Sequence, residues 1–139
     1  MPQLPTHDRA DAESTHRDYV LDVRIVEFST ADGPAYRFEA PHNDGATFDD
    51  AETAELYADV YFDVNGFDEE GVGDRGVPPT IIQAGRDTLV AYFLTQSYAD
   101  ERWIASFYGE KPEKIDRYVN RVQKRAARIR DGARDRGLA

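Results

Sequence analysis

Apolar and polar side chains alternate in two neighbouring segments near the start of the chain, residues 18–29 and 35–40. Alternation with a period of two residues is typical of β-strands. The pair Asp32-Gly33 between the segments is typical of a tight turn. The pattern therefore predicts a β-hairpin over residues 18–40. Because a lone hairpin is only marginally stable, another element should cover its apolar face.

The apolar residues then change to a helical spacing, which places on one face of a helix the residues Leu56, Tyr57, Val60, Tyr61 and Val64. Thr47 is suited to capping the start of this helix, and the aspartates that follow favour its positive end. The pair Asn65-Gly66 is suited to ending it. The sequence thus predicts a helix that begins at Thr47, ends at Asn65 and covers the hairpin.

A second helical spacing extends over residues 79–97, where Pro79 suits a first helical turn. Within it, the run from Thr88 to Leu94 is largely apolar on all sides. A central β-strand over 88–95 is therefore the alternative to a helix in that part.

The end of the chain contains clear helix boundaries. Asp100 can cap a short helix that extends to Tyr108 and is ended by Gly109, and Pro112 suits the first turn of a last helix over 112–135. The expected fold class is α+β, with an N-terminal β-hairpin covered by a helix. A C-terminal part of about three helices follows, and the last of these is long, basic and amphipathic.

The chain has 139 residues, which is the length of one domain rather than two. Residues 1–17 contain two prolines and few apolar side chains, which predicts a mobile N-terminal tail. We expect residues 18–139 to form a single α+β domain. Its parts are the hairpin and helix of 18–66, a loop over 67–78, and a helical part over 79–136.

The composition excludes several classes of protein. The chain has no cysteine, which excludes disulfide scaffolds, thiol catalysis and cysteine zinc sites. No apolar run approaches the length of about 18–20 residues that spans a bilayer, and no signal peptide opens the chain. We therefore expect a cytoplasmic protein without a membrane partner.

The net charge of −10 has an unusual origin, because Asp outnumbers Glu by 17 to 10 and Arg outnumbers Lys by 14 to 3. A surface rich in short carboxylates and poor in Lys resembles the proteins of salt-loving archaea, whose cytoplasm holds molar salt. Such salt reduces the screening length to about 3 Å and relieves the self-repulsion of a charged domain. We expect a halophilic protein, and the alternative is an ordinary acidic protein of a low-salt organism.

Several motifs resemble chemical sites but lack the context that each site needs. The glycines of 71–76 have the spacing GxGxxG, but three carboxylates precede them and would repel a pyrophosphate. The acidic segment 63–70 lacks the oxygen spacing of a calcium loop. His7, His16 and His42 lack a zinc spacing, and no serine lies in a glycine elbow. We expect no cofactor, no metal and no catalytic residue, and an enzyme of unrecognised type is the remaining alternative.

The segment 104–122 has the apolar spacing of two helices that cross. Ala105 is small where the helices approach, and Gly109 permits a tight turn between them. Ile115, Val119 and Val122 hold the second helix against the first. In these positions the segment resembles the helix-turn-helix of LuxR-type regulators and of sigma-factor region four. The resemblance covers about 20 residues and implies that the second helix enters the major groove of DNA.

Positive charge is concentrated at the same end of the chain, since residues 1–109 carry a net charge of −15 and residues 110–139 carry +5. Six bases of the last helix fall in one arc of roughly 100° beside its apolar stripe, where they could neutralise phosphates. Together with Asn120, a side chain suited to reading bases, they form the predicted DNA-binding set. This set is Lys114, Arg117, Asn120, Arg121, Lys124, Arg125 and Arg128.

Two kinds of partner fit this arrangement. We expect a small, non-enzymatic DNA-binding or transcription-associated protein whose partner is double-stranded DNA. The alternative is a protein interaction module whose basic helix docks on an acidic partner or on a second copy of the chain. The same bases could instead pair with carboxylates of their own chain, which would remove the basis of the DNA hypothesis.

Overall fold

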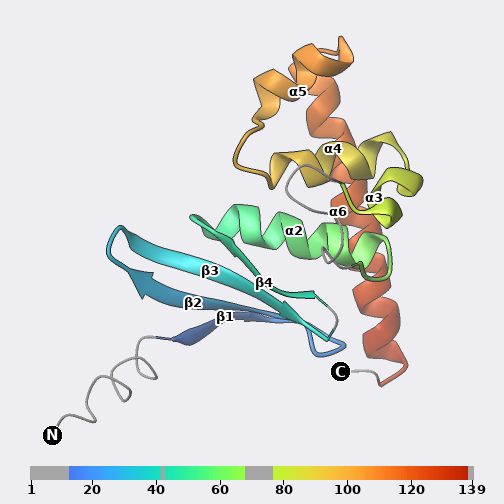
Figure 1. Cartoon of the computed structure of the whole chain (residues 1–139). Coiled ribbons are helices and arrows are strands. Elements are labelled where there is room, and N and C mark those ends of the chain that lie inside the picture. Colours follow the sequence, from blue (N-terminus) through green and yellow to red (C-terminus); the bar gives the residue numbers. More distant parts are fainter. Residues whose placement is uncertain (1–12, 42, 68–76, 138–139) are drawn as a thin grey trace, which may run out of the picture.

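The computed structural model describes residues 13–41, 43–67 and 77–137 of the chain. These residues form a four-stranded antiparallel sheet and five helices (Figure 1), so the prediction of an α+β fold is confirmed. Most of the predicted tail and of the predicted loop over 67–78, including the glycine motif at 71–76, lie outside the described residues. No helix in the described ranges is long and apolar enough to cross a membrane.

The sheet is a meander in which each strand pairs with the next along the chain. Its strands are β1 (Ser14–Asp18), β2 (Arg24–Thr30), β3 (Gly33–Ala40) and β4 (Asn43–Phe48). The central strands β2 and β3 pair along their whole length, from Arg24 opposite Glu39 to Thr30 opposite Gly33. The sheet is therefore larger than the hairpin expected from the sequence, because it has a further strand at each edge.

The first edge strand corrects the prediction of a tail that extends to residue 17. Residues from Ser14 onward pair with β2, and His16 of this strand hydrogen-bonds the carboxylate of Glu55 at 2.8 Å. The strand predicted over 18–29 is likewise interrupted by a turn. Leu21 and Asp22 adopt left-handed φ values of 62° and 61° in this turn.

The other edge strand corrects the predicted start of the first helix. Thr47 belongs to β4 and lies opposite Arg37 of β3. The helix α2 (Ala51–Asp63) is capped instead by Asp50, whose carboxylate accepts a hydrogen bond from the backbone N–H of Thr53 at 2.7 Å. The prediction of Thr47 as the cap is therefore wrong, because Thr47 is paired within the sheet and the Asp50 carboxylate satisfies an amide at the helix start instead.

The segment predicted as one helix over 79–97 is two helices, α3 (Pro79–Ala84) and α4 (Arg86–Leu94). Gly85 separates them with a φ of 118°, which is outside the helical range. The apolar run from Thr88 is helical, so the alternative of a central strand there is wrong. The helices α5 (Glu101–Tyr108) and α6 (Pro112–Asp135) have the bounds expected from their caps.

The main core lies on both sides of α2, which packs against the sheet on one side and against α4 and α6 on the other (Figure 1). Within this core, the ring of Tyr57 on α2 packs against Phe38 of β3 and against Phe67, which follows the helix. A second, smaller core joins α4, α5 and the first half of α6. Its buried members are Val90, Ile104, Ala105, Ile115 and Tyr118.

Candidate nucleic-acid interface

The helices α5 and α6 form a pair joined by a turn of three residues. Asp100 caps α5, and Gly109 ends it in the left-handed conformation with a φ of 67°. Ala105 of α5 and Ile115 of α6 are buried together in the smaller core. Ala105, Gly109 and Ile115 are thus positions at which these two helices meet or turn, whereas Val122, which was expected to pack against α5, is buried in the main core instead.

Four bases form a continuous strip on the exposed side of α6. We name Arg117, Arg121, Lys124 and Arg128 the basic strip, and all four are exposed. Their spacing places them in an arc of about 60° along about 16 Å of helix. Among the described residues, none of the four forms an ion pair with a carboxylate. Asn120, the remaining polar member of the predicted set, is exposed beside the strip.

The basic strip points away from α5. Ile115, which packs against α5, lies about 150° around the helix axis from the centre of the strip. A partner could therefore approach the strip without contacting α5.

Arg125 does not belong to this exposed surface, although the sequence placed it in the same basic arc. Its Nε donates to Asp63 at 2.6 Å and its Nη1 donates to Asp87 at 2.8 Å. Its Nη2 donates to Asp63 at 3.0 Å and to the hydroxyl of Thr88 at 3.2 Å. We name these four residues the arginine clamp, because they join α6 to the end of α2 and the start of α4.

The clamp changes the pKa values of its members. Hydrogen bonds to Asp63 and then to Asp87 raise the pKa of Arg125. Burial alone would raise the pKa of Asp87, but the hydrogen bond and the charge of Arg125 outweigh burial and hold this pKa below its ordinary value. Both groups are therefore charged at neutral pH, and Arg125 is unavailable to a phosphate.

Lys114 is partly buried, and its ammonium group lies 5.6 Å from the centre of the Tyr118 ring. The guanidinium of Arg121 lies 5.7 Å from the same ring. Tyr118 is itself buried, and its ring forms cation–π contacts with both Lys114 and Arg121. Of the two cations, only Arg121 remains part of the exposed strip.

Carboxylates gather where the amino-terminal ends of α5 and α6 meet. Glu113 and Asp116 are exposed on α6, and the carboxyl group of Glu101 on α5 lies close to that of Asp116. The sharing of a proton with Asp116, followed by burial and by the charges of Asp116 and Glu113, raises the pKa of Glu101. We name these three residues the acidic cluster, and it repels phosphates from the first turn of α6.

Sequence reasoning missed an exposed group of aromatic rings beside the helix pair. Tyr98, Trp103 and Phe107 are 58%, 42% and 63% exposed, and we name them the aromatic patch. A helical projection of α5 could have found two of them. Trp103 and Phe107 are four residues apart on the side opposite Ala105, where a solvent-facing helix normally carries polar side chains.

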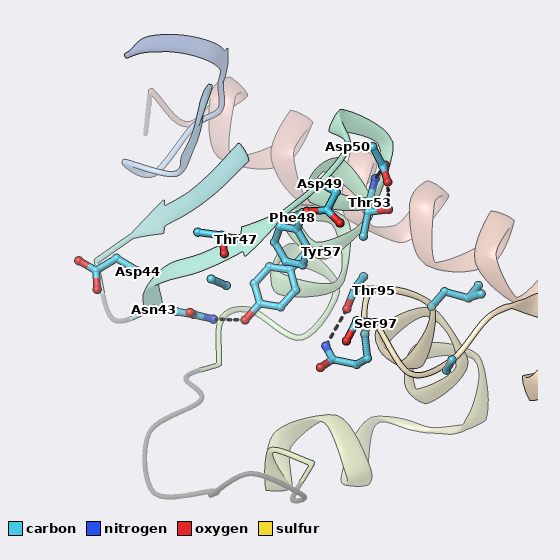
Figure 2. A pocket seen from close by; sticks show the side chains of 14 residues that line it. Asn43, Asp44, Thr47, Phe48, Asp49, Asp50, Thr53, Tyr57, Thr95 and Ser97 are labelled. Carbon is cyan, nitrogen blue, oxygen red and sulfur yellow. Dashed lines mark hydrogen bonds between the residues drawn. The ribbon is translucent and has the colours of Figure 1, made fainter. Parts of the chain in front are cut away.

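Sequence reasoning also missed a hollow of about 960 Å³, which lies between β4, the start of α2 and the segment after α4 (Figure 2). Phe48 and Tyr57 lie at its apolar side, and Asn43 donates a hydrogen bond to the Tyr57 hydroxyl at 3.0 Å. Asp44 and Asp49 line it, and no basic side chain is among its described lining residues. An anion such as a phosphate would therefore be repelled from this hollow.

In the described residues, no group of three or more His, Cys, Asp or Glu side chains could hold a metal ion. Comparison of the chain with protein-family models, with curated proteins and with solved structures gives no match. The function must therefore be argued from the chain's own side chains.

Proposed function

We propose that this protein binds double-stranded DNA through the basic strip of α6 and has no enzymatic activity. The observation that carries the proposal is that four bases in a row face solvent and that none of them forms an ion pair with a carboxylate among the described residues. The chain offers 27 carboxylates and a net charge of −10. An acidic protein has ample means to neutralise such a strip internally, so a strip left open is suited to an anionic partner from outside.

The dimensions of α6 suit a DNA groove. An α-helix with its side chains is about 10–12 Å wide, and the major groove of B-DNA is about 12 Å wide. The smaller core holds α6 against α5, which leaves the strip exposed along about three turns of helix. This arrangement is consistent with the helix-turn-helix expected from the sequence.

The acidic cluster limits how α6 can approach DNA. Glu113 and Asp116 at the start of the helix repel phosphates, whereas the bases from Arg117 onward attract them. Contacts to the phosphate backbone therefore dominate the proposed binding, and they carry no sequence information. Asn120 and Arg117 are the side chains placed to read bases, and any sequence preference depends on them.

The composition favours a cytoplasm of concentrated salt for this function, since self-repulsion at −10 is relieved by screening. The same screening weakens binding that relies on counterion release. We therefore expect the strip to act through close contacts with phosphates and to contribute little long-range attraction.

The experiment compares two matched double variants by fluorescence anisotropy with a short labelled duplex over a range of KCl concentrations. One variant removes two strip charges, Arg117→Gln with Lys124→Gln. The control removes two exposed charges near the end of the chain, Arg134→Gln with Arg136→Gln. Removing one phosphate-binding charge reduces the slope of log affinity against log salt by about 0.9, so the slope should fall by about 2 in the strip variant and hardly at all in the control.

Equal loss of affinity in both variants would show that only the overall charge matters, and the role of the strip would be refuted. Absence of duplex binding by the parent protein at the lowest KCl concentration at which circular dichroism shows it folded would refute the function itself. Far-UV circular dichroism verifies that both variants keep the helical content of the parent.

A further inference from the structure

The hollow between β4, the start of α2 and the segment after α4 has the size of a site for a small molecule (Figure 2). Its volume of about 960 Å³ lies near the upper end of the range of roughly 300–1,000 Å³ that ligand pockets occupy. In the described part of the chain, no three carboxylate, imidazole or thiol side chains are placed to hold a metal ion. The occupant expected from these facts is an organic molecule that contacts side chains of several elements.

Two side-chain amides line the hollow and leave their oxygens open. Asn43 and Thr95 are 6% and 5% exposed, so their polar atoms are largely shielded from bulk water. The Nδ2 of Asn43 donates to the Tyr57 hydroxyl, and the Nε2 of Gln96 donates to the Thr95 hydroxyl, both at 3.0 Å. Among the described residues, no donor hydrogen-bonds the amide oxygen of Asn43 or of Gln96. Both oxygens can therefore accept from a donor outside the chain.

The charge of the hollow is negative. Its described lining contains no Lys, Arg or His, and its carboxylates are those of Asp44, Asp49 and Asp50. Asp50 is engaged as the cap of α2, and Figure 2 shows Asp44 directed away from the other lining side chains. Asp49 is exposed and forms no ion pair or side-chain hydrogen bond with another described residue. Its carboxylate is thus the one open to a ligand, and it favours a cation.

An aromatic ring adjoins this carboxylate in the chain. Phe48, the last residue of β4, is half-buried, and the centre of its ring lies 5.1 Å from that of Tyr57. Tyr57 is only 1% exposed, so Phe48 presents the accessible ring of the hollow. An aromatic ring attracts a cation placed over its face, and its apolar surface also packs against a carbon chain. The ring and the carboxylate together suit an organic cation.

We propose that the hollow binds a small linear amine whose ammonium groups reach Asp49 and the amide oxygens of Asn43 and Gln96. An ammonium group has three N–H donors and no acceptor, which matches a lining that offers acceptors. A neutral polyol also donates hydrogen bonds, but it gains nothing from the charge of Asp49 or from a cation–π contact with Phe48. The proposal does not rest on DNA binding, because none of the described lining residues belongs to α6.

The experiment is isothermal titration calorimetry at the lowest KCl concentration at which circular dichroism shows the protein folded. The probes are α,ω-diaminopentane, α,ω-pentanediol of the same chain length, and magnesium chloride. Diaminopentane should saturate a single site, whereas pentanediol should give no saturable heat. Magnesium chloride at an equal concentration should not displace the amine, because the hollow lacks a cluster of metal ligands in its described lining.

Matched variants then localise the site. Asp49→Asn should weaken binding of diaminopentane about five- to tenfold, because it removes the charged acceptor. The control Asp22→Asn makes the same charge change in the turn between β1 and β2, outside the described lining, and should hardly affect binding. Phe48→Leu should weaken binding about two- to fivefold, whereas Phe28→Leu at a half-buried position of β2 should not. Thermal melts verify that all four variants remain folded.

Four results would overturn the proposal. The first is the absence of saturable amine binding by the folded parent. The second is an equal loss of affinity in Asp49→Asn and Asp22→Asn, because the amine would then respond only to the overall charge. The third is binding of pentanediol as tight as that of diaminopentane, and the fourth is displacement of the amine by an equal concentration of magnesium. Failure of the proposed DNA function alone leaves this proposal intact, since the titrations contain no DNA.

Discussion

Replacing Arg125 by Met tests whether the arginine clamp holds the helices together. Met keeps much of the length and the apolar stem of Arg but removes all of its hydrogen-bond donors. The substitution leaves Asp63 and Asp87 without the guanidinium that joins them, and it breaks the link from α6 to α2 and α4. Asp63 then keeps the hydrogen bond that the Thr88 hydroxyl donates to it at 2.6 Å.

The expected magnitude follows from the burial of the partners. Removing one member of a buried ion pair costs about 3–5 kcal/mol, because the remaining charge stays buried without compensation. The side chain of Asp63 is 3% exposed, which fits that case, but Arg125 is 34% exposed and water can replace part of it. We therefore expect the free energy of unfolding to fall by about 2–3 kcal/mol. In a chain of this length, the Tm then falls by roughly 7–10 °C.

The assay is urea unfolding followed by circular dichroism at fixed KCl, and the control is Arg134→Met. Arg134 also pairs with a carboxylate from α6, at 3.0 Å from Asp131, but both side chains are mostly exposed. Such surface pairs contribute about 0–1 kcal/mol, so the control should unfold nearly as the parent does. Adding Asp63→Asn to Arg125→Met should recover about 1 kcal/mol, because the neutral amide needs less solvation. Equal stability of the Arg125→Met and Arg134→Met variants would refute the reasoning.

Three further outcomes follow from the charges and the backbone. The pKa of Asp87 is held below its ordinary 3.8, so its contribution to stability is complete above pH 3.8 and is lost as the pH falls through the lowered value. Urea unfolding should therefore show less loss of stability with acid in Arg125→Met than in the parent, and identical acid profiles would contradict this. The Tm of the parent should rise from dilute buffer to molar KCl, and a melt insensitive to salt would contradict the halophilic interpretation. Gly109→Ala should cost about 1 kcal/mol because of its left-handed φ, whereas Gly132→Ala inside α6 should stabilise by about 0.5–1 kcal/mol in the same urea assay. Effects of the same sign would contradict the assigned backbone conformations.

The elements predicted from the sequence are those whose boundaries are set by local chemistry. Asp100, Gly109 and Pro112 set the ends of α5 and α6, because a cap, a left-handed glycine and an N-terminal proline act within one turn of helix. The same holds for the exposed basic strip, since a periodic pattern on a long helix separates its buried side from its solvent side.

The features that the sequence did not predict depend on neighbours far along the chain. The edge strands β1 and β4 carry few apolar side chains and are held by hydrogen bonds to β2 and β3. The partners of Arg125 are 62 and 38 residues away, so its spacing on α6 could not distinguish it from the exposed bases. The aromatic patch was missed for another reason, because aromatic side chains in a short helix are usually assigned to the core.

The arginine clamp and the basic strip both use side chains of α6, but we expect the clamp to act on stability and the strip to act on DNA binding. On α6, Arg125 lies about 70° around the axis from the centre of the strip, between the strip and the buried stripe. Its bonds to Asp63 and Asp87 therefore fix the rotation of α6 that keeps the strip directed to solvent. Strip substitutions should thus weaken DNA binding without lowering stability, whereas Arg125→Met should lower stability first and weaken binding only as the temperature approaches its reduced Tm. If Arg125→Met weakened binding at low temperature as much as the strip variant does, Arg125 would itself contact DNA and the clamp would have to open in the complex.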